Sequence, residues 1–84
     1  MTKEQETQIE DIIDALVEVA DDQQVPRNVK SKIEIVVKIL KEDSEPSMRV
    51  NKVLHYLDEI ADDGNLQPFT RTQVWNIVSM LEKI

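Results

Sequence analysis

With 84 residues, the chain has room for one domain with a small core, because chains this short bury only about 60% of the surface that they expose when unfolded. It contains no cysteine, which excludes disulfides, thiolate zinc sites and cysteine nucleophiles. Its 17 acidic and 10 basic side chains give a net charge of −7, which argues against direct nucleic-acid binding, since phosphate contacts need an excess of Lys and Arg.

The sequence predicts no targeting or membrane-spanning segment. Residues 1–6 are polar and acidic, unlike the basic and then apolar start of a signal peptide. Apolar runs also stay far below the length of about 18 residues that a membrane helix needs. We therefore expect a cytoplasmic protein with no membrane partner.

The first predicted helix runs from about Glu4 to Asp21. Its apolar residues follow the i, i+3, i+4, i+7 spacing of one helix face, with acidic residues on the opposite face. These apolar residues are Ile9, Ile12, Ile13, Leu16, Val19 and Ala20. The helix should end before Val25, because Pro26 disfavours a helical conformation for the residue that precedes it.

The second predicted helix runs from about Pro26 to Lys41. Proline suits the first turn of a helix, where its missing N–H group is not needed. The main apolar stripe of this helix consists of Val29, Ile33, Val36, Val37 and Leu40. Ile35 and Ile39 lie roughly 120° from that stripe, at about 100° of rotation per residue. The helix thus has more apolar surface than one seam can cover.

A third helix is predicted from about Pro46 to Asp62, and a fourth from about Pro68 to Lys83. Gly64, the only glycine, follows the third helix, at a position that often takes a left-handed conformation. Three large apolar residues lie off the central line of the fourth helix: Phe69, Trp75 and Met80. No run alternates with a period of two, so no strand is predicted.

The chain repeats itself at an offset of 41 residues, so that Ile9 matches Val50 and Asp22 matches Asp63. The register continues without a gap into the last helix, where Leu40 matches Leu81. We interpret the chain as a single helical domain, 1–84, with an internal duplication whose halves are residues 1–41 and 42–84.

Helices of similar length joined by short turns predict antiparallel neighbours. Two hairpins that each have one apolar face can bury those faces only against each other, which predicts an all-α, four-helix up-and-down bundle. A repeat of this length also fits a HEAT-like pair of helical repeats. We favour the closed bundle, because stable solenoids usually need three or more repeats.

Three strings in the chain resemble a known family: residues 20–22 (Ala-Asp-Asp), 25–29 (Val-Pro-Arg-Asn-Val) and 70–78 (Thr-Arg-Thr-Gln-Val-Trp-Asn-Ile-Val). They are similar to a family of small, acidic, all-helical archaeal proteins of uncharacterised function. The resemblance covers nearly the whole chain and implies a compact cytoplasmic helical bundle. It brings no catalytic residues with it.

His55 is the only histidine, and it falls outside the inward stripe of the third helix. General acid–base catalysis uses a partnered, partly buried imidazole, and no nucleophile with an orienting group can be identified here. We therefore interpret His55 as a surface residue and assign no catalytic residues. No cofactor-binding residues are assigned either, because the chain has no glycine-rich phosphate loop.

Paired aspartates follow the first and third helices, as Asp21 with Asp22 and as Asp62 with Asp63. Negative charge is unfavourable at helix C-termini, so the repeated placement raises the hypothesis of a divalent metal site. The second pair lacks the alternating ligands and distant Glu of an EF-hand loop. We interpret both pairs as turn-forming residues and assign no metal ligands.

Basic residues concentrate in the second helix, and the segments around it are acidic. The basic residues are Arg27, Lys30, Lys32, Lys38 and Lys41. Salt pairing with the acidic first and third helices explains them, and contact with an RNA inside a larger complex is the alternative.

Five apolar residues form a possible interface because they exceed what one seam can bury: Ile35, Ile39, Phe69, Trp75 and Met80. Deep burial in the bundle is the alternative explanation for this surplus.

The function is not determined by the sequence. Our interpretation is a non-enzymatic protein-interaction or structural module that contacts a protein partner or a second copy of itself. The alternatives are an accessory protein of a ribonucleoprotein, and an enzyme or metal-binding protein that uses acidic residues.

Overall fold

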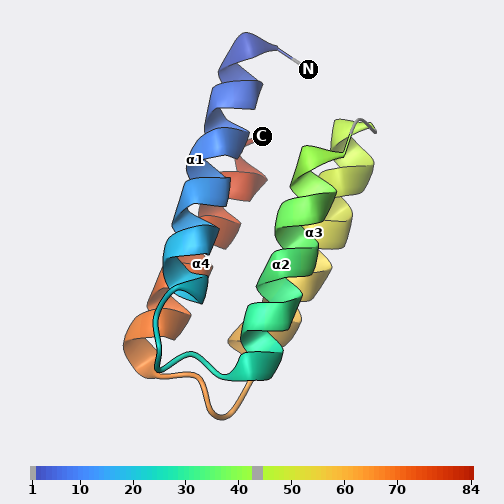
Figure 1. Ribbon diagram of the computed structural model, residues 1–84. Coiled ribbons are helices and arrows are strands. Elements are labelled where there is room, and N and C mark those ends of the chain that lie inside the picture. Colours follow the sequence, from blue (N-terminus) through green and yellow to red (C-terminus); the bar gives the residue numbers. More distant parts are fainter. Residues whose placement is uncertain (1, 43–44) are drawn as a thin grey trace.

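Four antiparallel helices account for most of the chain. The computed structural model describes residues 2–42 and 45–84. Its helices are α1 (Lys3–Ala20), α2 (Arg27–Lys41), α3 (Pro46–Ala61) and α4 (Pro68–Glu82), and these two segments contain no strand. Figure 1 shows the first turns of α1 rising above the other helices. The all-α prediction is confirmed, and each helix begins and ends within one residue of its predicted bounds.

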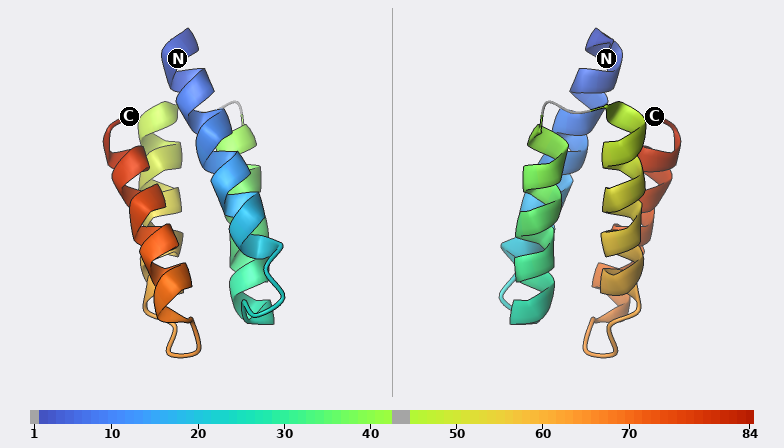
Figure 2. Two further views of the ribbon diagram at one scale, coloured as in Figure 1. Left: turned by 90° about the vertical axis from the view of Figure 1, so that its left-hand side faces the viewer. Right: turned by 90° about the vertical axis from the view of Figure 1, so that its right-hand side faces the viewer.

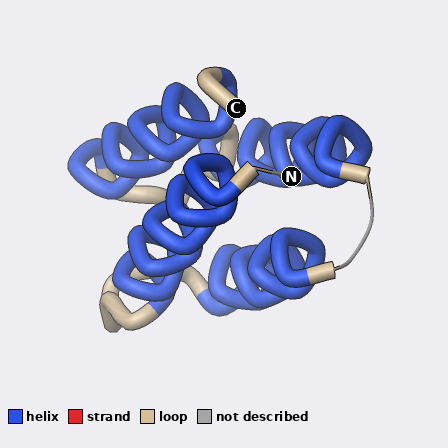
Figure 3. The backbone as a smooth tube through the Cα atoms, turned by 90° about the horizontal axis from the view of Figure 1, so that it is seen from above, coloured by secondary structure: helices blue, strands red, loops and turns tan. Residues whose placement is uncertain are grey.

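The helices form a closed, four-sided bundle. Helix α1 packs against α2 and α4, and α3 packs against the same two helices, as the end-on view shows (Figure 3). Within the described segments, neither diagonal pair of helices is in contact. A HEAT-like pair would instead stack α1 on α3 and α2 on α4. The up-and-down bundle is therefore confirmed, and it measures 36 × 19 × 17 Å.

The core is built from equivalent positions of the two repeats. Leu16 and Leu57 occupy the same place in α1 and α3, and both are fully buried. The same holds for seven further buried pairs: Ile12 with Val53, Val19 with Ile60, Val25 with Leu66, Val29 with Thr70, Ile33 with Val74, Val36 with Ile77 and Leu40 with Leu81. All of these side chains except the polar Thr70 belong to a single apolar core shared by the four helices.

The turns after α1 and α3 have the same backbone design, and both lie at the same end of the bundle (Figure 2). In the first turn the Asp22 side chain accepts a hydrogen bond from the Gln24 N–H at 2.9 Å, and in the second Asp63 accepts one from Asn65 at 2.8 Å. Each aspartate side chain thus provides an acceptor for a backbone N–H group that lies just beyond the end of the helix.

Gly64 does not have the left-handed conformation that its position predicts, because no glycine in the described segments has a positive φ. The repeat explains the difference. The residue at the same place in the first turn is Gln23, so this turn geometry is one that a residue with a side chain adopts without strain. A methyl group added to Gly64 would also meet no atom within 4 Å.

Two arginines bind main-chain carbonyl groups at helix ends. Arg49, at the start of α3, is buried and donates to the carbonyl oxygens of Leu40 at 3.2 Å and Glu42 at 2.7 Å. It thereby binds the end of α2, where carbonyl groups lack intrahelical partners. Arg71 of α4 does the same for the second turn. Its guanidinium donates to three carbonyl oxygens, those of Ala61 at 2.8 Å, Asp63 at 2.9 Å and Leu66 at 3.3 Å.

Candidate protein-interaction surface

Helix α4 differs from the rest of the surface in its lack of charge. Charged residues make up 32% of the chain, yet none occurs from Thr72 to Leu81. Arg71 precedes this stretch, but its guanidinium is turned toward the carbonyl groups of the second turn. The solvent-facing side of α4 is therefore neutral over almost three helical turns.

The equivalent helix of the first repeat shows how unusual this is. At the offset of 41 residues, three polar or aromatic residues of α4 correspond to three charged residues of α2. The pairs are Gln73 with Lys32, Trp75 with Glu34, and Ser79 with Lys38. The same fold position is thus charged in one hairpin and neutral in the other, so the backbone does not require the absence of charge.

Three large apolar side chains are exposed on α4. Phe69 is 72% exposed, Trp75 is 48% exposed and Met80 is 36% exposed. Aromatic residues and methionine are enriched, and charged residues depleted, at the centres of protein–protein interfaces. We define the neutral face of α4 by its seven residues: Phe69, Thr72, Gln73, Trp75, Asn76, Ser79 and Met80.

Grooves run along both margins of the neutral face. Toward α1, a groove of about 170 Å³ is bordered by Glu18, Gln73 and Met80, among others. Toward α3, a shallow hollow of about 490 Å³ is bordered by Trp75 and by Asp62 with other polar residues. The neutral face thus has apolar and amide side chains at its centre and acidic residues at its margins. Protein–protein interfaces have a similar arrangement, with a core depleted in charge and a polar rim.

The two isoleucines of the predicted interface are placed differently by the structure. Ile39 is only 8% exposed and belongs to the core, whereas Ile35 is 42% exposed. Ile39 lies in the α2–α3 seam, in a groove that Lys52 and Tyr56 also line. Of the two side chains, only Ile35 is therefore available to a partner. It lies on α2, apart from the neutral face.

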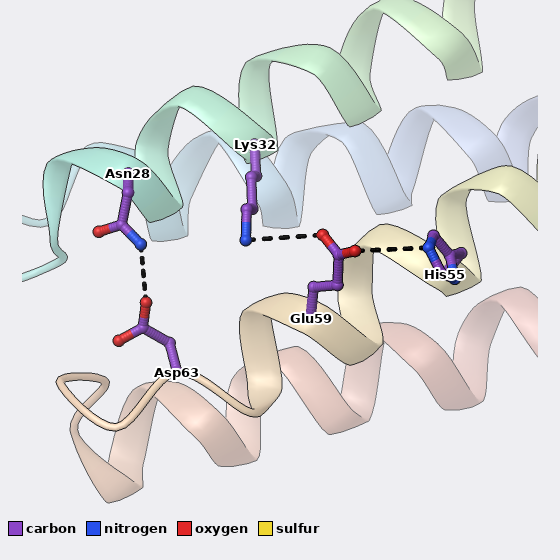
Figure 4. Close-up of polar contacts among 5 residues, drawn as sticks. All are labelled: Asn28, Lys32, His55, Glu59 and Asp63. Carbon is purple, nitrogen blue, oxygen red and sulfur yellow. Dashed lines mark hydrogen bonds and ion pairs between the residues drawn. The ribbon is translucent and has the colours of Figure 1, made fainter.

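The α2–α3 seam is bridged by polar contacts (Figure 4). Asn28 donates to the Asp63 carboxylate at 2.7 Å, and the Lys32 ammonium lies 3.5 Å from the Glu59 carboxylate. His55 lies one helical turn before Glu59 and 3.4 Å from the same carboxylate. In the described segments, Lys32–Glu59 is the ion pair that joins two helices. Of the five basic residues for which salt pairing is predicted, Lys32 is thus the one found paired across helices, and its partner lies on α3 and not on α1.

The Asp63 carboxylate of the second turn accepts two hydrogen bonds, one from Asn28 of α2 and one from within the turn. The hydrogen bond from the Asn28 side chain, followed by that from the Asn65 N–H, lowers the pKa of the Asp63 carboxyl below its ordinary value of 3.8. Within residues 2–42 and 45–84, no three His, Asp or Glu side chains converge as metal ligands do. The turn hydrogen bonds of Asp22 and Asp63 support the turn-forming interpretation for the second aspartate of each pair.

His55 is 74% exposed in its side chain, as the sequence predicts, and its ring lies edge-on to that of Tyr56. The described segments also contain no helix with the length and hydropathy to cross a membrane.

A comparison with families of known proteins decides to which group the chain belongs. The model of an uncharacterised protein family, UPF0147, matches residues 1–84. The chain belongs to the UPF0147 family. A UPF0147 protein of Methanocaldococcus jannaschii is 44% identical over 68 residues, which are 80% of this chain and 73% of the relative. One of Sulfurisphaera tokodaii is 34% identical over 80 residues, 94% of this chain and 90% of the relative.

Two crystal structures have the same fold. A protein of unknown function, MMP1188, superposes with a TM-score of 0.85 at 37% identity, over 92% of this chain and 89% of that chain. A UPF0147 protein from Thermoplasma acidophilum also gives a TM-score of 0.85, at 31% identity and 92% coverage of both chains. The predicted resemblance to an uncharacterised archaeal family is therefore confirmed, and the function of that family is unknown.

Most residues of the UPF0147-like strings have structural roles in this chain. Val25 and Val29 are buried, Asn28 binds Asp63, and Arg71 binds the second turn. Trp75 differs from them, because almost half of its surface faces solvent. The packing of the fold thus accounts for the buried residues of these strings but not for the exposed Trp75.

Sequence analysis missed the two carbonyl-binding arginines. The sequence places Arg49 in a string, residues 45–50, that resembles the proline-then-basic start of a HEAT helix, and Arg71 in the string of residues 70–78, but neither pattern predicts a carbonyl-binding role. The signal that was available is the position of each arginine, within the first turn of a helix that follows a tight connection. At such a position a long side chain can reach back to the carbonyl groups that end the preceding helix.

Proposed function

We propose that the chain is a non-enzymatic protein-interaction module whose contact surface is the neutral face of α4. The observation that carries this proposal is the run from Thr72 to Leu81, which has no charge although almost a third of the chain is charged. A protein surface in water gains solubility from charged residues. A neutral, aromatic strip at a position that the first repeat fills with charges is therefore best explained by contact with another protein.

The chemistry of the neutral face also supports binding over catalysis. Its side chains carry amide, hydroxyl, indole, phenyl and thioether groups, which pack and form hydrogen bonds but do not exchange protons near neutral pH. The face also lacks the basic residues that phosphate recognition requires. We place the module in the cytoplasm, a reducing compartment that suits a chain without cysteine. Cell fractionation followed by immunoblotting tests this location, and recovery in a secreted or membrane fraction would contradict it.

The absence of cysteine gives a direct test of the contact surface. Ser79→Cys places a single thiol on the neutral face, and Lys38→Cys places one at the equivalent position of α2. Each purified variant is labelled with benzophenone maleimide, added to lysate of the source organism and irradiated. Cross-linked proteins are identified by mass spectrometry, in lysate treated or not treated with nuclease.

We expect the probe at position 79 to cross-link a defined protein, with or without nuclease, and the matched probe at position 38 not to do so. Equal cross-linking from both positions would show non-specific contact and refute the neutral face as the binding surface. Products that disappear after nuclease treatment would refute direct protein contact and favour an RNA-associated role.

A further inference from the structure

The neutral face of α4 has the same pattern in both directions along the helix. Phe69, Gln73, Asn76 and Met80 follow one another at intervals of four, three and four residues, so they lie on one side of α4. Read from either end of the helix, these four residues are an apolar residue, two amides and an apolar residue. An antiparallel second copy of α4 would therefore place Phe69 against Met80 and Gln73 against Asn76, twice over.

Trp75 lies next to the midpoint of this pattern. It occupies the margin of the neutral face toward α3, whereas Met80 borders the groove toward α1. Suppose that a two-fold axis passes between two copies of α4, perpendicular to the helices and level with this midpoint. The α3 margin of one copy then faces the α3 margin of the other, and the two Trp75 rings come together. Aromatic pairs and contacts between aromatic rings and thioether sulfur are favourable, and paired amides satisfy each other's hydrogen bonds.

The charge distribution also favours α4 as the place where two copies meet. Each copy carries a net charge of −7, so contact between the α1 faces of two copies would bring like charges together. Helix α1 is acidic along its length, from Glu4 to Glu18. The neutral face of α4 adds no charge to the contact, and its acidic margins remain at the rim, where solvent and salt screen them.

From this self-complementary pattern we infer that the neutral face of α4 binds a second copy of the chain, in an antiparallel α4–α4 contact across a two-fold axis. The inference rests on the proposed function and names its partner. A closed two-fold contact needs a surface that is complementary to itself. The palindromic order of Phe69, Gln73, Asn76 and Met80 around Trp75 meets that condition.

The size of the surface sets the expected strength. Helix α4 has 15 residues and is therefore about 22 Å long. A contact made mainly by one such helix is smaller than the roughly 800 Å² per partner of a standard stable interface. We therefore expect reversible dimers with a dissociation constant on the order of micromolar or weaker.

Sedimentation equilibrium of the purified chain tests the inference, over concentrations from about 5 µM to 1 mM that bracket this affinity. We expect a monomer–dimer equilibrium, and stronger association in 1 M than in 50 mM salt, because salt screens the repulsion between two acidic copies. The emission of Trp75, the only tryptophan, should shift to shorter wavelength as concentration rises. A chain that stays monomeric at about 1 mM in both salts would overturn the inference.

The first repeat supplies substitutions that the fold accepts. Trp75→Glu and Phe69→Asn introduce the residues that α2 carries at the same positions, Glu34 and Asn28. Each should weaken self-association at least about tenfold, as loss of a central interface residue does. Ile35→Asn is the matched control, since it replaces an exposed apolar residue of α2 by the residue found at the equivalent place in α4. It should leave the dimer unchanged.

Circular dichroism of each variant confirms that a loss of dimer is not a loss of fold. If Ile35→Asn weakens the dimer as much as Trp75→Glu does, the two-fold contact through α4 is wrong. Oligomers that keep growing with concentration would also overturn it, because a two-fold contact closes at the dimer. A monomeric chain whose position-79 probe still cross-links another protein would refute self-association while leaving the proposed function intact.

Discussion

The two hairpins have the same backbone plan but different surfaces. Their helices, their turns and most of their buried positions correspond at a constant offset, down to the aspartate that accepts the turn hydrogen bond. They differ in what binds the turn and in what faces solvent. The second turn is held by Arg71 where the first has Lys30, and α4 is neutral where α2 is charged. Similar buried residues thus give the two hairpins the same fold, and this fold does not constrain the residues that the second hairpin exposes to solvent.

The largest expected effect tests the equivalence of the two halves of the core. Leu16→Ala and Leu57→Ala each remove a fully buried side chain and should each destabilise the fold by about 2–5 kcal/mol. Because the two sites correspond, the two losses in the free energy of unfolding should agree within about 1 kcal/mol. Urea denaturation followed by circular dichroism measures both. A much smaller loss at one site would show that the hairpins do not share the core equally.

The next effect concerns the arginine that binds the second turn. Arg71→Lys, which introduces the residue of the first hairpin, removes a planar donor that serves three carbonyl groups. Lysine cannot reproduce that geometry, so we expect a loss of about 1–3 kcal/mol. Lys30→Ala at the matched position should change stability by less than about 0.5 kcal/mol. Equal losses in both variants would mean that the two turns are held in the same way.

Gly64→Gln introduces into the second turn the residue that the first turn has at the same place, Gln23. Gly64 lacks a positive φ and has open space around it, so a side chain fits without strain. The substitution restricts the unfolded chain and should stabilise the protein by about 0.4–1 kcal/mol. Thermal denaturation of the two proteins provides the comparison. A lower melting temperature would show that the two turns differ in conformation.

The smallest effect is the acid dependence contributed by Asp63. Its pKa is lower in the folded chain than the ordinary value of 3.8, so the folded state favours the ionised carboxylate. The contribution is therefore present above that value and is lost as the pH falls through the folded pKa. Asp63→Asn keeps a side-chain oxygen for the turn but removes this titration. Its melting temperature should fall less steeply than that of the wild type between about pH 5 and pH 2.5. Identical slopes would contradict the prediction.

Much of the fold could be predicted from the sequence because the apolar spacing is regular and occurs twice. The period of Ile9, Ile12 and Leu16 defines a helix face, and the repeat fixes which residues of the second half share its environment. The apolar spacing does not predict the conformation at Gly64, and the available signal was the repeat, which aligns Gly64 with Gln23. Glycine permits a left-handed conformation without requiring one, and here the Asp63 side chain completes the turn without it.

The candidate site was predictable in part. Phe69, Trp75 and Met80 lie off the apolar stripe of α4, and their exposure follows from that rotation. Ile35 and Ile39 could not be separated by the same argument, since residues four apart differ by only about 40° around a helix. Their burial depends on the neighbouring helix, because near Ile39 the α2–α3 seam is lined by Lys52 and Tyr56 of α3. Such a contact is set by tertiary packing, which helical periodicity does not describe.

The closed four-sided arrangement also has a consequence for folding kinetics. Three of the four seams join helices that follow each other in the chain, and only the α1–α4 seam joins its two ends. Bundles with such local contacts fold within microseconds to milliseconds. Formation of the α1–α4 seam brings the two ends of the chain together, which costs more conformational entropy than forming a seam between consecutive helices. We therefore expect this seam to form last and to open first. The surface proposed for partner contact thus lies beside the part of the bundle that opens most easily, and a bound partner would slow amide exchange there before anywhere else.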